Sequence, residues 1–328
     1  MKILVTGGNG MLGSAILRVF HQQHELHFTA RTPDVARQLA EGFHACPHLV
    51  DLRDREAVEK VCRGMEAIIH CAALSSPWGK QEDFYQNNVA ATTNLVNAAR
   101  NHGIERFVHI SSTSVYFDHQ DRWKIRETDN IALRWCNDYA RTKYLSELEA
   151  LKAPGKTVIL RPRGIFGPND RAIIPRVLKA IKSNKLILPS GRNPVVDLTY
   201  VDNVANAAML ACLRAEQLDD GEVFNISNDE PMPVETILRA LCEGLDLNVT
   251  IQNLSYGFIS PLLRLNERIR LLLPHQPEPR LTSYSAGLFH YHQTLDISKA
   301  KQLLNYKPAF SIQEGIQQYA NWAANKVF

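Results

Sequence analysis

Short apolar runs alternate with longer amphipathic segments through the first half of the chain. Apolar runs of strand length predict β-strands, and segments whose apolar residues recur every three or four positions predict helices. The predicted strands are Lys2–Thr6, Leu26–Ala30, His48–Val50, Ala67–His70, Arg106–Ile110 and Thr157–Arg161. The predicted helices are Met11–His21, Thr32–Glu41, Arg55–Arg63, Phe84–His102 and Asp138–Leu151. This alternation indicates an α/β fold in which a parallel sheet is doubly wound, with helices on both faces.

The pattern becomes mixed after Pro162. Further helices are predicted at Ile173–Ser183, Val201–Arg214 and Pro233–Leu245, and a strand is predicted at Val223–Ile226. The stretch from Ser114 to Asn137 has no strong period, which predicts a loop over the functional site.

Two structural units are expected from this change of pattern. Residues 1–165 are expected to form the doubly wound domain, and residues 166–328 a smaller C-terminal lobe that binds a substrate. A segment near residues 195–228 is expected to return to the first unit, because it contains a predicted strand.

Composition narrows the class of protein. The 328 residues are 45% hydrophobic and 22% charged, as in globular proteins. A dispersed formal charge of +3 argues against nucleic acid as a partner. The most apolar long stretch, Phe258–Leu273, is interrupted by charged residues. It predicts an amphipathic helix rather than a membrane span.

The six cysteines show neither CxxC spacing nor clustering with histidine. This pattern predicts no metal site and is typical of reduced, mostly buried thiols in a cytoplasmic protein. We also expect no signal peptide, because Met1-Lys2 runs directly into an apolar predicted strand.

A glycine-rich segment joins the first predicted strand to the first predicted helix. Gly7 permits a tight turn, Gly10 lets the backbone approach a pyrophosphate, and Gly13 lets the helix pack against the strand. The amides at the helix N-terminus favour an anionic group. The segment therefore predicts a dinucleotide site in a Rossmann fold. The ligands expected here are Thr6, Gly7, Gly10, Met11, Leu12 and Gly13.

The end of the second predicted strand bears on cofactor choice. NAD-binding proteins usually place a carboxylate there to accept a hydrogen bond from the ribose 2′-OH. This chain has Arg31 and no carboxylate, and a guanidinium pairs well with a phosphate. We therefore expect NADP(H) to be preferred, with NAD(H) possible. Asp51 and Leu52 are expected at the adenine.

Ser112, Tyr139 and Lys143 form a candidate proton-transfer group. Tyr139 and Lys143 are four residues apart on a predicted helix and so share a face. The ammonium is expected to lower the tyrosine pKa, which suits a general acid/base. Ser112 follows a predicted strand, and its hydroxyl could bind a substrate oxygen. Combined with the glycine segment, this group predicts hydride transfer at a carbonyl or carbinol carbon.

Over nearly its whole length the chain resembles the extended short-chain dehydrogenases/reductases. The resemblance is carried by the motifs above, by His70-Cys71-Ala72-Ala73, by Asn88-Val89-Ala90-Ala91-Thr92, and by Arg161-Pro162-Arg163-Gly164-Ile165-Phe166-Gly167-Pro168. It implies Tyr139 as acid/base, Lys143 as activator and ribose ligand, and Ser112 as the oxygen-orienting hydroxyl. The further cofactor contacts that it implies are Cys71, Ala72, Ala73, Asn88, Pro162, Arg163, Gly164 and Ile165. A homodimer through Phe84–His102 and Asp138–Leu151 is expected on the same ground.

The substrate class is predicted from the stretch Gly191–Val204. Sugar-nucleotide epimerases resemble the stretch Gly191–Val204 but carry an arginine before the aspartate, where this chain has Val196. An apolar side chain cannot pair with a phosphate, so a ligand for the substrate pyrophosphate is missing here. The form GxNxxVDxTYVDNV of this stretch instead resembles the 3β-hydroxysteroid dehydrogenase group, including 2-alkyl-3-oxoalkanoate reductases. A small apolar hydroxy or keto substrate is expected. Residues 258–273 could cover it or touch a membrane surface.

Two alternatives to this reading stay open. The chain could be a nucleotide-sugar epimerase or dehydratase, which tight binding of a nucleotide sugar would favour. It could also be a non-catalytic module that senses NADP(H), although such modules often lose the tyrosine or lysine that this chain keeps.

Overall fold

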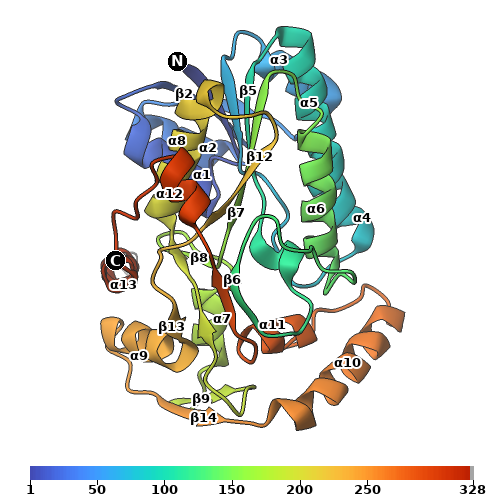
Figure 1. Cartoon of the computed structure of the whole chain (residues 1–328), viewed down its shortest axis with the longest axis vertical. Helices are drawn as coiled ribbons and strands as arrows, with labels where there is room; N and C mark the ends of the chain where they lie inside the picture. Colours follow the sequence, from blue (N-terminus) through green and yellow to red (C-terminus); the bar gives the residue numbers. More distant parts are fainter. Residues whose placement is uncertain (326–328) are drawn as a thin grey trace.

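A seven-stranded parallel sheet forms the centre of the molecule in the computed structural model, which describes residues 1–325 (Figure 1). The strand order is β12-β7-β5-β4-β1-β2-β3. The strands are β1 (Lys2–Thr6), β2 (Glu25–Ala30), β3 (Cys46–Leu49), β4 (Ala67–His70), β5 (Arg106–Ile110), β7 (Lys156–Pro162) and β12 (Glu222–Ile226). The order reverses between β1 and β4, so ligands are expected beyond the carboxyl ends of these strands.

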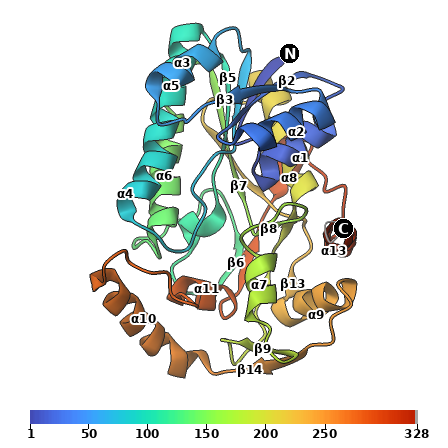
Figure 2. The ribbon, with the colours of Figure 1, turned by 180° about the vertical axis from the view of Figure 1, so that it is seen from behind.

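Helices cover both faces of this sheet (Figures 1 and 2). One face carries α1 (Met11–Phe20), α2 (Pro33–Phe43) and α8 (Val201–Arg214), and the other carries α3 (Arg55–Cys62), α5 (Ala91–His102) and α6 (Asp138–Ala150). Successive side chains of β1 point to opposite faces of the sheet and pack against the helices on both sides. Ile3 and Val5 belong to one apolar core and Leu4 to the other, which explains why the whole strand is hydrophobic.

The remaining strands form three small sheets. The largest has the order β13-β10-β15-β6, and the others pair β11 with β8 and β14 with β9. Their bounds are β6 (Arg122–Ile125), β8 (Ile165–Phe166), β9 (Lys185–Leu188), β10 (Val195–Val196), β11 (Thr199–Tyr200), β13 (Met232–Pro233), β14 (Thr250–Asn253) and β15 (Gln293–Leu295). The other helices are α4 (Gln81–Phe84), α7 (Ile174–Ala180), α9 (Val234–Gly244), α10 (Tyr256–Leu272), α11 (Ser283–Leu288), α12 (Ser298–Leu303) and α13 (Ile312–Ala324). Figure 1 places α9, α10, β9 and β14 at the end away from the N-terminus.

The predicted strand at Val223–Ile226 is confirmed as β12, which pairs in parallel with β7 at the edge of the large sheet. The chain therefore does return to the sheet after residue 195. The expected division at residue 165 stays a prediction. No helix within residues 1–325 has the length and apolar character to span a membrane.

Three details of the expected pattern are wrong. The strand expected at His48–Val50 is Cys46–Leu49, shifted by its register with β2. The stretch Ser114–Asn137 is not all loop, because β6 forms there by pairing with β15, a partner far away in the sequence. The helix expected at Phe84–His102 is not one α-helix, since a π-helical turn separates α4 from α5.

Candidate active site

The glycine segment forms a tight cradle between β1 and α1. Gly7 has φ +68°, a left-handed conformation, and a Cβ there would lie 2.9 Å from the Ala72 Cα. A Cβ on Gly13 would collide with the Gly7 carbonyl oxygen. The turn is fixed from β2, because the Gly7 amide donates to Thr29 Oγ1 at 3.0 Å. Only glycine fits at these two positions.

The N-terminus of α1 opens towards this cradle. Its N-cap is Gly10, and no side chain accepts a hydrogen bond from the first amides of the helix. These amides and the helix dipole favour an anion. The absence of any Cβ at Gly10 leaves the backbone approachable, so the cradle fits the pyrophosphate of a dinucleotide. Thr6 supports it from below, since its Oγ1 bonds His70 Nδ1 at 2.7 Å and accepts from the Ala72 amide at 3.1 Å.

Charged residues surround the site expected for the adenosine. Arg31 follows β2, is exposed, and has no ion-pair partner within residues 1–325. Asp51 instead pairs with Arg53, whose guanidinium lies 2.6 Å from its carboxylate. Arg53 lowers the Asp51 pKa to about 2, and the charge of Arg31 contributes. Leu52 is buried, so only its backbone is available to a base.

Tyr139, in the first turn of α6, lies beside two serine hydroxyls. Ser112 follows β5 and Ser75 follows β4, and these parallel strands bring both residues to the same edge of the sheet. Burial raises the Tyr139 pKa, and hydrogen bonds with Ser75 and Ser112 only partly offset this. The expectation that Lys143 lowers this pKa is therefore wrong. Ser75 was not predicted as a site residue, because nothing in the sequence distinguishes it from Ser76 beside it.

Lys143 lies one helical turn beyond Tyr139 and is 2% exposed. Its Nζ donates to the Ile110 carbonyl oxygen at 2.6 Å, which turns it towards the sheet. Burial lowers its pKa to about 8, against the opposing charge of Glu147. Its neighbour His70 is neutral, since burial lowers the pKa of that imidazole to about 3. Lys143 is thus a cation near pH 7 that loses its charge more easily than an exposed lysine.

A buried ion pair lies beneath Lys143 and was not predicted. Arg161 on β7 donates to both carboxylate oxygens of Glu147 on α6, from Nε at 2.9 Å and from a terminal nitrogen at 2.6 Å. A second terminal nitrogen of Arg161 donates to the Tyr116 hydroxyl at 2.6 Å. The paired side chains are 6% and 2% exposed. They join α6 to the sheet directly under the candidate catalytic lysine.

Asn88 lies in the π-helical turn Tyr85–Ala90. Its Oδ1 accepts from the Leu74 amide at 2.7 Å, and its Nδ2 donates to Thr142 Oγ1 at 3.0 Å. This buried amide therefore ties the segment after β4 to α6. π-Helical turns often occur at functional sites, because the extra residue redirects a side chain. Asn88 was expected as a cofactor contact from the sequence, but the π-helical turn that holds it was not predicted.

A cavity of about 280 Å³ lies next to Tyr139, between the segment after β4, the start of α6, α10 and α11. Trp78, Phe84, Cys136, Arg264, Leu271 and Tyr284 are among its lining residues. Burial raises the Tyr284 pKa, and nearby Arg163 opposes this. Apolar residues and charged residues both line the cavity, and the charged ones are Asp138, Arg264, Glu267 and Arg268.

Arg163 is a buried cation without a partner. It follows β7 and is 7% exposed, and within residues 1–325 its guanidinium makes no hydrogen bond or ion pair. Burial lowers its pKa, while the charges of Tyr284 and Asp197 oppose this. A buried charge is normally paired, so Arg163 is suited to bind an anionic group.

The other expected contacts divide into two groups. Cys71, Ala72 and Ala73 follow β4. Across from them, Pro162 ends β7, Gly164 lies in the turn after it, and Ile165 begins β8. Val196 is 5% exposed within β10, so no phosphate could reach it.

The expectation that no cysteine clusters with histidine is wrong. The register of β2 with β3 sets His27 opposite Cys46, and His48 lies two residues farther along β3.

Comparison with known proteins identifies the family. A family model described as "NAD dependent epimerase/dehydratase family" matches residues 3–227. The chain is 31% identical over 330 residues to a 2-alkyl-3-oxoalkanoate reductase of Stenotrophomonas maltophilia (strain K279a), covering 97% of this chain and 98% of that protein. It is 29% identical over 331 residues to a decarboxylating sterol-4-alpha-carboxylate 3-dehydrogenase of Mus musculus, covering 97% and 89%.

A UDP-glucuronic acid 4-epimerase from Bacillus cereus, solved in complex with NAD, has a similar fold. Its TM-score is 0.75 at 22% identity, with all of both chains covered. The chain matches the reductase and dehydrogenase relatives over nearly their whole length, which supports its assignment as an NAD(P)-dependent oxidoreductase. With a family model matched over most of its length, the chain belongs to the NAD-dependent epimerase/dehydratase family of extended short-chain dehydrogenases/reductases.

Proposed function

We propose that the protein is an NADP(H)-dependent oxidoreductase that interconverts a secondary alcohol and a ketone on an apolar substrate. The observation that carries this proposal is the placement of Tyr139 between two serine hydroxyls, with Lys143 one turn away and the glycine cradle across the sheet edge. A nicotinamide cofactor, held by the cradle and by Lys143, would supply or accept the hydride.

The protein's own residues handle the proton and the oxygen. In reduction, the Ser112 hydroxyl donates a hydrogen bond to the substrate oxygen as negative charge develops on it. Tyr139 then gives its hydroxyl proton to that oxygen. The raised Tyr139 pKa suits this direction, because the side chain is protonated near pH 7. The Lys143 ammonium stabilises the tyrosinate left behind.

The substrate is proposed to be a ketone with a carboxylate on the neighbouring carbon. Arg163 supplies the cation that such a carboxylate needs, buried and unpaired near Tyr284. The names of both relatives describe this chemistry. A 2-alkyl-3-oxoalkanoate and a sterol 4-carboxylate oxidised at carbon 3 each carry the carboxylate on the carbon that neighbours the reacting carbon. Arg163 is thus proposed as a substrate ligand in place of the cofactor contact expected from the sequence.

The test is NADPH and NADH oxidation by the purified protein with a 2-alkyl-3-oxo acid and with its methyl ester. Turnover of the acid that is abolished in Tyr139→Phe, with cofactor binding retained, is the expected result. Undiminished turnover in Tyr139→Phe would refute the catalytic assignment.

Arg163→Met separates the substrate proposal from the reductase proposal. This variant is expected to raise KM for the acid at least about tenfold while leaving the ester little changed, because a charge-assisted hydrogen bond is worth about 1.5–3 kcal/mol. Equal effects on acid and ester would refute the carboxylate contact and leave the reductase intact.

Preference for NADP(H) is proposed from the unpaired Arg31 at the end of β2 and from the lack of a carboxylate there. Asp51 does not serve as the carboxylate that binds the ribose 2′-OH, because it is already paired with Arg53.

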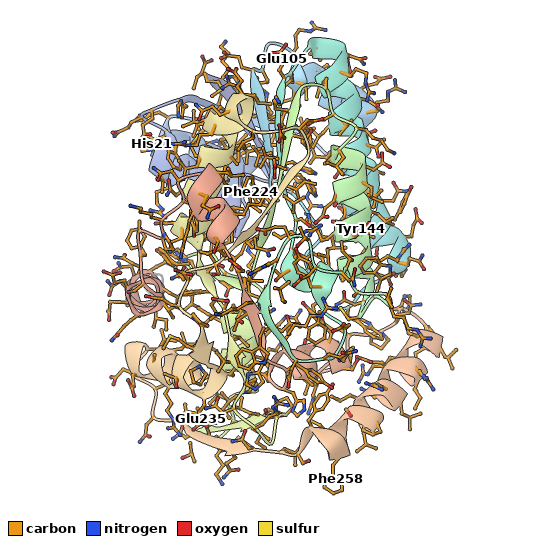
Figure 3. The ribbon with its side chains drawn as sticks, viewed as in Figure 1. His21, Glu105, Tyr144, Phe224, Glu235 and Phe258 are labelled. Atoms are coloured by element: carbon orange, nitrogen blue, oxygen red, sulfur yellow. The ribbon has the colours of Figure 1, made fainter. Side chains whose placement is uncertain are left out.

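We also propose that α10 rests on a membrane surface from which the apolar substrate enters. Five large apolar side chains, each at least half exposed, recur along it at helical spacing: Phe258, Leu262, Leu265, Ile269 and Leu272. Figure 3 shows Phe258 pointing away from the body of the molecule. Arg264 and Arg268 flank this stripe and also line the cavity, so one helix contributes both to the exposed apolar surface and to the candidate substrate site. An apolar stripe beside arginines is typical of interfacial helices.

A homodimer through α5 and α6 is proposed from the family resemblance, and Leu148 and Leu151 on that side are each 40% exposed. Analytical ultracentrifugation tests it, and Leu148→Glu is expected to yield monomers.

A further inference from the structure

The edge of the large sheet carries a cluster of nitrogen and sulfur ligands that the proposed reaction does not use. β3 is the edge strand, and its register with β2 sets Cys46 opposite His27. His48 lies two residues beyond Cys46 and therefore points to the same face. The ligand atoms of the three side chains all lie within 4.8 Å of one another. The two imidazoles stack, with ring centroids 5.2 Å apart.

We propose that His27, Cys46 and His48 bind a Zn²⁺ ion. Thiolate sulfur and imidazole nitrogen are the ligands that zinc prefers in proteins. Zinc–ligand bonds of about 2.0–2.3 Å place tetrahedral ligand atoms about 3.3–3.8 Å apart. His27 Nδ1 and His48 Nε2 are 2.9 Å apart, so a small separation of the rings makes room for the ion. A water molecule would complete the coordination.

Glu25 supports this assignment as a positioning residue. Its Oε1 lies 3.1 Å from His27 Nε2, the ring nitrogen opposite the proposed ligand atom. A carboxylate that accepts from one ring nitrogen leaves the other free to bind a metal and fixes the ring's orientation. Lys2 Nζ lies 3.2 Å from the same carboxylate oxygen, so Glu25 also has a cationic partner.

The access of solvent to the cluster and the balance of the binding step both agree with metal binding. Cys46 is exposed and reaches solvent directly. Binding forms one zinc–sulfur and two zinc–nitrogen bonds, breaks the His27–His48 hydrogen bond, and releases the Cys46 thiol proton to water without redox change. The ion would clip the edge strand to β2, immediately before the Val50–Leu52 segment expected at the adenine.

The test is a titration of tag-free, full-length protein with ZnCl₂ by isothermal calorimetry after treatment with a chelator. One ion per chain is expected for the wild type and for the control His44→Asn, which replaces a nearby exposed histidine. Cys46→Ser and His48→Gln should weaken binding at least tenfold. Glu25→Gln should weaken it about 10–100-fold, as expected for loss of a carboxylate that orients a ligand.

A second measurement identifies the thiol. Zinc is expected to protect Cys46 from iodoacetamide, mapped by mass spectrometry, and Co²⁺ is expected to give a thiolate charge-transfer band that Cys46→Ser lacks. The proposal is overturned if the wild type binds no stoichiometric zinc, or if the Cys46→Ser/His48→Gln double variant binds it as tightly. Circular dichroism checks that each variant is folded, and none of these readouts depends on activity.

Discussion

Replacing one member of the buried Glu147–Arg161 pair is expected to affect both stability and the pH profile of catalysis. The two side chains make two close N–O contacts with almost no exposure to water. Glu147→Gln leaves the guanidinium buried without its counter-charge, and Arg161→Met leaves the carboxylate in that state. Breaking a buried pair in this way costs about 3–5 kcal/mol of unfolding free energy.

The double variant should be less damaged than the two single variants suggest. Glu147→Gln/Arg161→Met removes both charges, so no uncompensated ion remains in the core. Its loss of stability should fall well below the sum of the single losses, because residues in contact are not additive. Urea denaturation at pH 7, followed by circular dichroism, measures all three values. A protein in the upper part of the ordinary stability range of about 5–15 kcal/mol stays folded after either single change.

The two single variants should move the catalytic pH profile in opposite directions. Burial lowers the Lys143 pKa to about 8, and the negative charge of Glu147 acts against this. Wild-type reduction should therefore fall as pH rises through about 8, when Lys143 loses its proton. Glu147→Gln removes the negative charge and should shift this fall to lower pH. Arg161→Met leaves Glu147 uncompensated and should shift it to higher pH.

Two results would refute this reasoning. If the double variant loses as much stability as the two single variants together, the charges do not compensate each other. If both single variants shift the alkaline limb of kcat/KM in the same direction, Glu147 does not act on Lys143 through its charge. Glu149→Gln removes a charge of α6 that pairs with Lys152, so it provides the control for general effects on that helix and should change neither quantity appreciably.

Three further predictions concern the cofactor and α10. Arg31→Asp should move the ratio of NADPH to NADH affinity towards NADH by at least about tenfold, as measured by fluorescence titration, because it replaces a phosphate ligand by a carboxylate; an unchanged ratio would remove the argument for NADP(H). Gly13→Ala should abolish measurable binding of either cofactor while the fold persists, since its Cβ would collide with the Gly7 carbonyl oxygen; retained affinity would show that the cradle holds no pyrophosphate. Phe258→Ser/Leu262→Ser should reduce flotation with anionic vesicles strongly, whereas Leu133→Ser, which changes a 99% exposed leucine elsewhere, should not.

Much of the candidate site could be predicted because its determinants are local. The strand–glycine–helix segment contains its own turn, and the four-residue spacing of Tyr139 and Lys143 sets both on one helical face. Strands β1, β4 and β5 have the predicted bounds because a strand buried on both faces is apolar throughout. The predicted α8 also has the observed bounds.

The features that were missed depend on residues far apart in the sequence. β6 exists only through β15, and Ser75 reaches Tyr139 only because neighbouring strands end at one edge of the sheet.

The amino-acid sequence by itself determined the doubly wound architecture, the glycine cradle and the candidate catalytic trio, because hydrophobic period, glycine placement and helical spacing are properties of short segments. The tertiary structure alone decided the electrostatics. It buried Lys143 above Glu147 and Arg161, left Arg163 without a partner, and set His27 opposite Cys46 through strand register. Burial and pairing depend on what the folded chain brings together, and a linear pattern of residues does not contain that information.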